Sequence, residues 1–410
     1  MRVLIVYRHF WPDSPPYAAM LLAIGRHLAG RGHDVSVLTQ QPSYKSVDAD
    51  KRRPSREVLD GMLVRRMSLV FGPARSGVLN ALERLLFPVR VMLFAVARRG
   101  RGEAYDVVWT ATQPPVLNGF GASVAARLLG ARFIYHCQDI YPELAAYSGA
   151  VKPGGPVYRI MMWLDRSTCR RAERCVVLSD DMADTLAARG VPRAKIDVVR
   201  NFLPGERDAA AVAARPAGRS RDRYRVIFAG NIGHFQGLSA AIEAARLLRD
   251  GLPHVEFVLL GEGKALPGLR IQAAGLPNVR FMSHLDATAA DRVIASADLG
   301  LVSLQPNIYR VAYPTKTITY LALGLPILAV VEAESSLAGL VERDRIGVVA
   351  HGMCGTALAE AVRTAVARTG DATMMSERAR AVHARDFSMQ RALDCWTRMV
   401  EHTDASRASH

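Results

Sequence analysis

The chain has 410 residues, half of them hydrophobic, and a formal net charge of +15 at pH 7. A single hydrophobic core rarely grows this large, so two domains are expected, and the hydrophobic fraction is ample for both cores. The excess of positive charge favours an anionic partner, such as nucleotide phosphates, nucleic acid or a membrane face.

The five cysteines are scattered and form no CxxC pair, which argues against a disulfide framework or a zinc site. The first apolar run, VLIVY, is too short for a signal peptide and is followed by Arg8 and His9. We therefore expect no export signal and a chain of the reducing cytoplasm.

Strand and helix signals alternate along the first half of the chain. Apolar runs typical of buried strands cover residues 2–7, 34–39, 106–110, 132–137 and 174–179. Helical spacing of apolar residues covers 17–30 and 117–129 and begins again near Asp181. Strand–helix–strand units of this kind build a parallel sheet.

The alternation stops once and then restarts. Residues 205–223 have no apolar periodicity and are typical of a linker. Beyond them, a helical segment at 238–251 lies among strand-like runs at 225–230, 255–263, 278–283, 297–304 and 325–330. Two open α/β units joined by a linker form a cleft, and ligands of such sheets bind beyond the carboxyl ends of the strands.

An ordered set of segments resembles glycosyltransferase family 4. The segments are GRHLAGRGHDVSVLT, QDIYPE, FAGNIGHFQGLSAAIEAA, LLGEG, ASADLGLVSL and YPTKTITYLALGLPILAV. They extend the resemblance over roughly residues 1–400, and its specificity lies in their order and spacing. The chain looks most like the branch that makes bacterial surface polysaccharides, such as lipopolysaccharide and exopolysaccharide.

The resemblance implies an α/β fold of the GT-B type, with two Rossmann-like domains whose parallel sheets face an interdomain cleft. It implies an acceptor-binding domain at 1–204, a linker at 205–223 and a nucleotide-sugar-binding domain at 224–385. Residues 386–410 would supply a helix that crosses back to the first domain, and a tail.

The resemblance also implies transfer with retention from a nucleotide sugar, most commonly UDP-linked, with no metal and no cofactor. No aspartate pair of the DxD type appears where a metal-dependent transferase would need one. The phosphate charge must then be met by cationic side chains and helix N-termini.

The segment YPTKTITY, residues 313–320, is the first candidate for the phosphate site. Pro314 suits a helix start, Thr315 and Thr317 can cap the helix or donate hydroxyls, and Lys316 adds positive charge. We expect the donor diphosphate here, with Lys316 stabilising it as it leaves. The alternative is an ordinary capped helix with a solvated lysine.

Two glutamates that the family usually carries in this region are absent. Aligned on PTKTITYLALG, their positions fall at Val311 and Thr319, so how the sugar and the ribose are held stays open.

A second expected donor contact is the loop GNIGHFQG, because its glycines allow close backbone approach. Asn231 and Gln236 stand where many relatives have an arginine and a lysine, which leaves more of the charge to Arg310 and Lys316. A simple βα turn is the alternative. The donor residues expected besides the YPTKTITY segment are Gly230, Asn231, Gly233, Gln236, Gly261, Gly263 and Arg310.

In the first domain, HCQDIYPE places His136, Asp139 and Glu143 at a strand end. A carboxylate or imidazole there could orient the acceptor hydroxyl or stabilise positive charge on the sugar ring. Asp139 is the first catalytic candidate and His136 the second, while Glu143, Pro16 and Tyr17 are expected to bind the acceptor. The alternative is that Asp139 caps the next segment and His136 is a packed strand residue.

Residues 62–101 contain eight arginines and a single acid, Glu83, with aliphatic and aromatic side chains between them. Such a basic amphipathic stretch suits an anionic inner leaflet, although it is interrupted too often for a transmembrane helix. The alternative is a helix packed on its own domain with a solvated basic edge. The membrane contacts expected are Arg84, Arg90, Arg98 and Arg99.

The resemblance, taken with the basic stretch, implies a hexosyl or N-acetylaminosugar transferase at the inner face of the plasma membrane, extending a polyprenyl-diphosphate-linked saccharide. A GT-B nucleotide-sugar epimerase is disfavoured by the basic apolar stretch, and a non-catalytic GT-B partner subunit is allowed by the absent glutamates. Nucleic acid is disfavoured because the arginines lie among aliphatic side chains rather than stacking aromatics.

Overall fold

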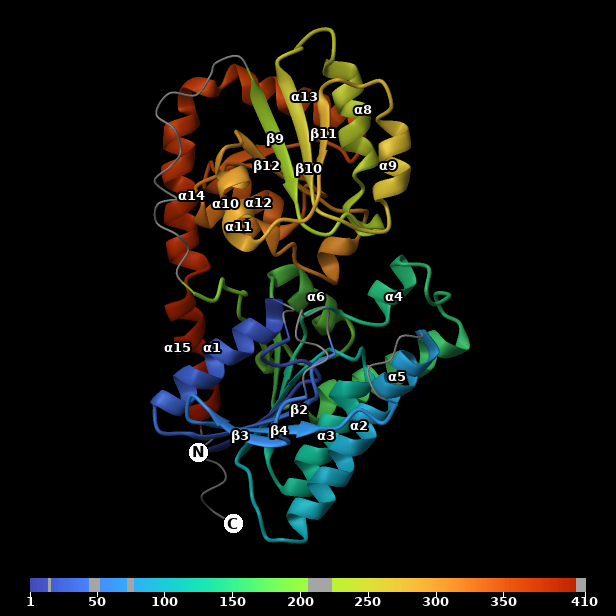
Figure 1. Cartoon of the computed structure of the whole chain (residues 1–410), viewed down its shortest axis with the longest axis vertical. Helices are drawn as coiled ribbons and strands as arrows, with labels where there is room; N and C mark the ends of the chain where they lie inside the picture. Colours follow the sequence, from blue (N-terminus) through green and yellow to red (C-terminus); the bar gives the residue numbers. More distant parts are fainter. Residues whose placement is uncertain (14–15, 44–51, 72–76, 206–222, 403–410) are drawn as a thin grey trace. The chain divides into compact units, whose positions relative to one another are not determined.

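The computed structural model describes residues 1–13, 16–43, 52–71, 77–205 and 223–402 (Figure 1). The chain divides into two compact units. Unit 1 contains Met1–Pro204 and the segment from Met389 onward, and unit 2 contains Gly205–Ser388. Residues 206–222 of the predicted linker lie outside the described residues.

Unit 1 is built on one sheet, in which the described residues form eight strands in the order β3-β4-β2-β1-β5-β6-β7-β8. Neighbouring strands are parallel except β3 and β4, which form an antiparallel hairpin. The order reverses between β1 and β5, and such a switch point is where open α/β sheets bind ligands. The strands are β1 (Arg2–Val6), β2 (Asp34–Gln40), β3 (Arg56–Leu59), β4 (Met62–Met67), β5 (Val107–Ala111), β6 (Arg132–His136), β7 (Arg174–Val177) and β8 (Ile196–Val198).

Helices cover both faces of this sheet. Val3 and Ile5 of β1 point into a core that α1 and α15 close from one side, because successive strand residues face opposite ways. Figure 1 shows α2, α3 and α5 together, and α3 packs against both of the others. The helices are α1 (Pro16–Gly30), α2 (Gly77–Arg99), α3 (Leu117–Leu129), α4 (Glu143–Tyr147), α5 (Pro156–Arg171), α6 (Asp180–Ala188), the 3-10 turn η1 (Arg193–Lys195) and α15 (Met389–Glu401).

Unit 2 repeats the plan with a six-stranded parallel sheet in the order β11-β10-β9-β12-β13-β14, counted over the described residues. Its order reverses between β9 and β12. The strands are β9 (Tyr224–Ala229), β10 (Val255–Leu260), β11 (Val279–Met282), β12 (Leu299–Ser303), β13 (Ile327–Val330) and β14 (Gly347–Val349). The helices and 3-10 turns are η2 (His234–Gln236), α8 (Ser239–Leu248), α9 (Leu266–Gln272), α10 (Ala287–Ala295), η3 (Ile308–Arg310), α11 (Lys316–Ala322), α12 (Ser336–Arg343), α13 (Gly355–Ala367), η4 (Thr369–Asp371) and α14 (Ala372–Asp386).

The basic stretch at 62–101 contains two elements of the described structure, because its first residues form β4 and Gly77–Arg99 form α2. In β4, Met62 and Val64 point into the core and alternate with less buried Leu63 and Arg65, which is the period of a strand. No helix of the described residues is both long and apolar enough to cross a lipid bilayer.

Candidate functional site

Two loops meet at the switch point of unit 2. The first follows β9 and begins at Gly230, and the second follows β12 and leads through η3 to α11. The Gln305 N–H donates to the Phe235 carbonyl at 2.7 Å, which ties the loops together. This edge of the sheet therefore carries both segments that the sequence predicted for the donor.

The Lys316 side chain points toward the contact between the loop after β9 and the loop after β12. Its Nζ lies 4.5 Å from the ring centroid of Phe228, and its Cε lies 3.9 Å from where a side chain on Gly230 would begin. Within the described residues the amine has no carboxylate partner and no hydrogen bond, and burial lowers the pKa of Lys316 to about 8. A half-buried cation without a counter-charge gains when an anion binds beside it.

The position of Lys316 is fixed by Tyr320, one helical turn further along α11. The Tyr320 hydroxyl accepts the Ala229 N–H at 2.8 Å and donates to the Ile227 carbonyl at 3.4 Å. Gly300 makes room for the ring, because a side chain there would meet it at 2.4 Å. The start of α11 is therefore clamped to the end of β9.

The hydroxyls beside Lys316 are not used by the helix. Thr315 occupies the N-cap position but forms no cap hydrogen bond, and Thr317 Oγ1 is buried with no hydrogen-bond partner in the described structure. The Thr317 N–H donates to the Pro314 carbonyl, so Pro314 does lead into the helix. A capping role for Thr315 was wrong, and both hydroxyls remain as possible donors to a ligand.

The predicted donor glycines differ in what they do. A side chain on Gly261 would lie 2.0 Å from the Gly230 carbonyl oxygen, and one on Gly263 would lie 2.2 Å from the Ile232 oxygen. These two glycines let the loop after β10 pack directly on the loop after β9. Gly230 itself has φ 131°, a conformation that favours glycine.

The two polar side chains predicted to contact the donor in the loop after β9, Asn231 and Gln236, differ in whether they are free to bind a ligand. Asn231 is exposed, whereas the Gln236 side chain accepts the Gly233 N–H at 3.0 Å. This bond closes the turn η2, so Gln236 supports the loop in the free protein. Asn231 is the freer of the two for a ligand.

Arg310 lies on η3 and is half-exposed. Its Nη2 lies 3.6 Å from Glu334 Oε1, and its guanidinium stacks over Tyr309. Val311 is buried and Thr319 is half-buried, so neither position supplies an acid. Glu332, which follows β13, accepts a hydrogen bond from the Asn307 N–H at 2.5 Å. A carboxylate therefore lies beside the loop that follows β12.

In unit 1, His136 ends β6 and is buried. Its Nδ1 lies 2.8 Å from the Tyr17 hydroxyl, its Nε2 lies 2.8 Å from Gln138 Nε2, and Trp396 packs against the ring. Burial lowers the pKa of His136 to about 3, so the imidazole is neutral at physiological pH. These contacts fit the alternative role of a packed strand residue.

Asp139 follows three residues later and is half-buried. Burial raises the pKa of its carboxyl to about 6, and among the described residues the carboxylate has no hydrogen bond or ion pair. Tyr141 lies close enough that the Asp139 charge adds to burial in raising the phenol pKa. Asp139 is thus a carboxylate without a hydrogen-bond or ion-pair partner in the described structure, and it lies at the carboxyl end of this sheet.

Glu143, unlike Asp139, is engaged in an ion-pair network. Arg189 binds it through Nε–Oε1 at 2.9 Å and through Nη2–Oε2, and the same guanidinium binds Asp165 at 2.6 Å. This ion-pair network is buried and ties α4 to α5 and α6. Of the other predicted acceptor residues, Tyr17 is buried against His136, and Pro16 is the first residue of α1, with its side chain outside the described part.

The four predicted membrane arginines differ in their partners. Arg98 pairs with Glu103, Arg99 donates to the Leu128 carbonyl, and Arg90 donates to the Ser68 carbonyl. Arg84 is exposed on α2. The single acid of the stretch, Glu83, is buried and accepts hydrogen bonds from Gln40 and from the Phe71 N–H.

Sequence reasoning missed several residues of these sites. Phe228 could have been found, because it lies two residues before Gly230 in an apolar strand. Tyr320, Tyr141 and the contact of Trp396 with His136 depend on pairings between distant segments, which periodicity does not reveal.

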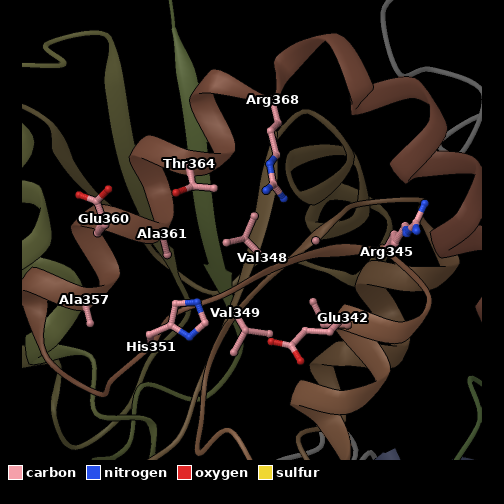
Figure 2. A pocket seen from close by; sticks show the side chains of 12 residues that line it. Glu342, Arg345, Val348, Val349, His351, Ala357, Glu360, Ala361, Thr364 and Arg368 are labelled. Carbon is pink, nitrogen blue, oxygen red and sulfur yellow. The ribbon is translucent and has the colours of Figure 1, made fainter.

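A separate cavity of about 460 Å³ lies in unit 2 between α12, α13 and the edge strand β14. Figure 2 shows Arg368 directed toward Val348 and the His351 ring beside Val349. None of the predicted site residues lines it. In the described part of the chain, no group of three metal-ligating side chains is found.

Two family models match the chain in tandem. The Glycosyl transferase 4-like domain matches residues 17–201, and the Glycosyl transferases group 1 domain matches residues 223–368. With the two parallel-sheet units, these matches define a glycosyltransferase of the GT-B class. The chain belongs to glycosyltransferase family 4.

Two curated relatives are similar over most of their length. The probable glycosyltransferase WbjE of Pseudomonas aeruginosa is 24% identical over 282 residues, 67% of this chain and 69% of WbjE. The putative colanic acid biosynthesis glycosyl transferase WcaI of Escherichia coli (strain K12) is 26% identical over 345 residues, 80% of this chain and 84% of WcaI.

Solved structures share the fold at low sequence identity. HepE of Anabaena in complex with UDP has a TM-score of 0.68 and 14% identity, covering 98% of this chain and 99% of HepE. Sucrose-phosphate synthase of Thermosynechococcus elongatus has a TM-score of 0.73 and 15% identity, covering 97% of this chain and 98% of that chain.

Proposed function

We propose that this glycosyltransferase moves a sugar, with retention, from a UDP-linked donor to a polyprenyl-diphosphate-linked saccharide in bacterial polysaccharide biosynthesis. The transfer needs no metal, and it occurs at the inner face of the plasma membrane. The observation that carries the proposal is Lys316, a half-buried amine without a counter-charge at the switch point of the second sheet.

The chemistry follows from the charges at this site. As the donor bond breaks, negative charge grows on the leaving diphosphate, and a fixed cation in a poorly solvated place stabilises it strongly. The hydroxyls of Thr315 and Thr317 and the backbone of the Gly230 loop supply neutral donors beside it. The leaving diphosphate takes the proton of the acceptor hydroxyl, and Asp139 orients that hydroxyl or stabilises the positive sugar ring.

The donor and the pathway are supported by relatives. HepE has been solved with UDP and with UDP-glucose, and WcaI is named for colanic acid biosynthesis. We carry both features to this chain as part of the proposal.

The membrane contact is supported by the exposed face of α2. Six apolar residues recur there at spacings of three and four, so they form one stripe along the helix. A stripe of this kind beside arginines suits a lipid interface better than water. The residues are Val78, Leu82, Leu85, Val89, Leu93 and Val96, which are between 39% and 72% exposed.

The proposal is tested by incubating the full chain with a panel of nucleotide sugars and vesicles that carry polyprenyl-diphosphate saccharides. Transfer from a UDP sugar is expected, and the anomeric configuration of the product, read by NMR, reports retention. Formation of an epimeric nucleotide sugar without an acceptor would favour the epimerase, and the absence of any turnover or donor binding would favour the non-catalytic subunit.

A further inference from the structure

A second pocket, of about 490 Å³, lies in unit 1 between α2 and the sheet edge formed by β3 and β4. Half of the ten residues that line it are arginines, and none is acidic. The arginines are Arg56, Arg65, Arg66, Arg90 and Arg98. Only two of the four arginines predicted to contact a membrane are among them.

The centre of the pocket is a pair of arginines that face each other across the hairpin. Arg56 of β3 and Arg65 of β4 are directly opposed in the antiparallel register. Opposed residues lie on the same face of a sheet, and like charges in this position are destabilising. The arrangement is therefore unfavourable unless an anion lies between the two guanidinium groups.

Neither of these arginines has a carboxylate partner in the described structure. Arg65 Nε is buried without a hydrogen bond, and burial together with the charges of Arg98 and Arg56 lowers the pKa of Arg65. The acids nearby are already engaged, since Glu57 pairs with Arg66 and Glu103 pairs with Arg98. Arg90, which donates to the Ser68 carbonyl, has no carboxylate partner either, so the charge not paired with an acid is carried by Arg56, Arg65 and Arg90 in the described structure.

The surroundings of the pocket indicate where its anion comes from. Leu93 lines the pocket and is 62% exposed, and it belongs to the apolar stripe of α2. Phe94 also lines the pocket, with the Arg98 guanidinium 4.9 Å from its ring centroid. A soluble phosphate needs no apolar rim, whereas a lipid presents its phosphate and its acyl chains together.

We propose that the Arg56–Arg65 pocket binds the phosphate of an anionic phospholipid headgroup while the stripe of α2 contacts the acyl layer. Guanidinium groups bind phosphate oxygens through paired hydrogen bonds, and two opposed forks can hold one phosphate from both sides. This inference rests on the membrane contact of the proposed function and names the lipid chemistry of that contact.

Co-sedimentation of the full chain with vesicles tests the pocket. One vesicle contains phosphatidylcholine with phosphatidylglycerol, and the other obtains the same surface charge from a fatty-acid carboxylate. Arg65→Gln is expected to weaken binding to phosphatidylglycerol vesicles about tenfold, the effect of losing one charge-assisted hydrogen-bond pair. Arg65→Lys is expected to recover part of the loss.

Arg292→Gln is the matched control, because Arg292 is an exposed arginine of α10 in unit 2 and carries the same charge. Its effect is expected to stay below about twofold, and on carboxylate vesicles the two variants should behave alike. If Arg65→Gln fails to fold, Arg56→Gln tests the same pocket from an exposed position.

Equal losses for Arg65→Gln and Arg292→Gln on phosphatidylglycerol vesicles would overturn the inference. So would calorimetric binding of glycerol phosphate that depends on Arg65 and is as tight as vesicle binding, because the pocket would then serve a soluble phosphate. Sedimentation uses neither donor nor acceptor, so a chain without transferase activity could still give the expected result.

Discussion

Lys316 and Asp139 are ionisable groups held in poorly solvated places without partners of opposite charge in the described structure. Burial lowers the pKa of Lys316 to about 8 and raises the pKa of Asp139 to about 6. Both shifts mean that the free protein would be more stable if these groups were uncharged. Charged groups kept at such a cost are typical of sites where a ligand supplies the missing charge.

Replacement of Lys316 by methionine is expected to reduce turnover by roughly two to three orders of magnitude, the scale of losing one electrostatic stabiliser. The same change should stabilise the free protein by about 3 kcal/mol at pH 7, because the depressed pKa makes the folded state bind its proton less tightly than the unfolded chain. This gain should vanish above the unfolded pKa of lysine. Steady-state kinetics and thermal unfolding measure the two effects.

The opposite signs of these effects separate a ligand-binding role from a structural one. Lys152→Met, at an exposed lysine of unit 1, is the control and should change neither quantity. A Lys316 variant that loses activity and stability together would instead indicate that the amine supports the fold. Wild-type donor affinity should also fall as the pH rises above about 8, because the amine then loses its proton.

Asp139→Asn tests the raised carboxyl pKa. Wild-type turnover should rise as the pH increases through about 6, because the carboxylate is the active form. The turnover of the variant should not show this rise. In the wild type, the neutral Asp139 carboxyl contributes fully to the stability of the fold at pH values below the pKa of this residue in the unfolded chain. That contribution is lost as the pH rises through about 6, the pKa in the folded protein. The variant should therefore be more stable than the wild type by about 3 kcal/mol at pH 7.5 and equal to it near pH 3.5. If the turnover of the variant still rises as the pH increases through about 6, Asp139 is not the source of that rise.

At the scale of elements, α2 shows how packing divides one amphipathic sequence into two surfaces. Glu83, Phe87 and Val91 are buried at spacings of four, and they face unit 1. The apolar stripe that begins at Val78 lies elsewhere on the same helix and is exposed. Gly121 of α3 allows the close approach of the two helices, because a side chain there would meet Pro88 at 2.7 Å.

A triple substitution, Leu82→Ser, Leu85→Ser and Val89→Ser, is expected to reduce binding to neutral and anionic vesicles alike. Each buried aliphatic side chain is worth about 1.5–3 kcal/mol, so the partition coefficient should fall by more than about a hundredfold. Thermal stability should change little, since these side chains are exposed in the free protein. Leu247→Ser with Ile271→Ser, at exposed positions of unit 2, serves as the control. Failure of the wild-type chain to bind any vesicle would remove the membrane contact from the proposed function.

At the scale of the whole molecule, the sequence predicted the repeated strand–helix pattern because buried parallel strands are continuous apolar runs. It placed Gly230 at a strand end and Lys316 at a helix start, and the fold brings them together. It could not predict that β3 and β4 would precede α2, because residues 56–67 carry too many charges to stand out as strands. Nor could it predict that Arg189 engages Glu143, since such a pairing joins residues 46 positions apart.

The last helix gives a test of how the two units divide the chain. Trp396 of α15 is buried in the core of unit 1 and stacks on Trp109 of β5, with ring centroids 4.1 Å apart. Phe387, nine positions earlier, is buried in unit 2. Two aromatic side chains close together in sequence are thus buried in different units.

Trp396→Ala should therefore destabilise unit 1 by about 3–5 kcal/mol, the usual cost of removing a buried aromatic side chain. Hydrogen exchange followed by mass spectrometry should show faster exchange in β5 and β6, because their amides lie in the sheet that α15 covers, and unchanged exchange in β9 and β10. Phe387→Ala should give the reverse pattern. If Trp396→Ala accelerated exchange in β9 and β10 as much as in β5 and β6, α15 could not be assigned to unit 1 alone.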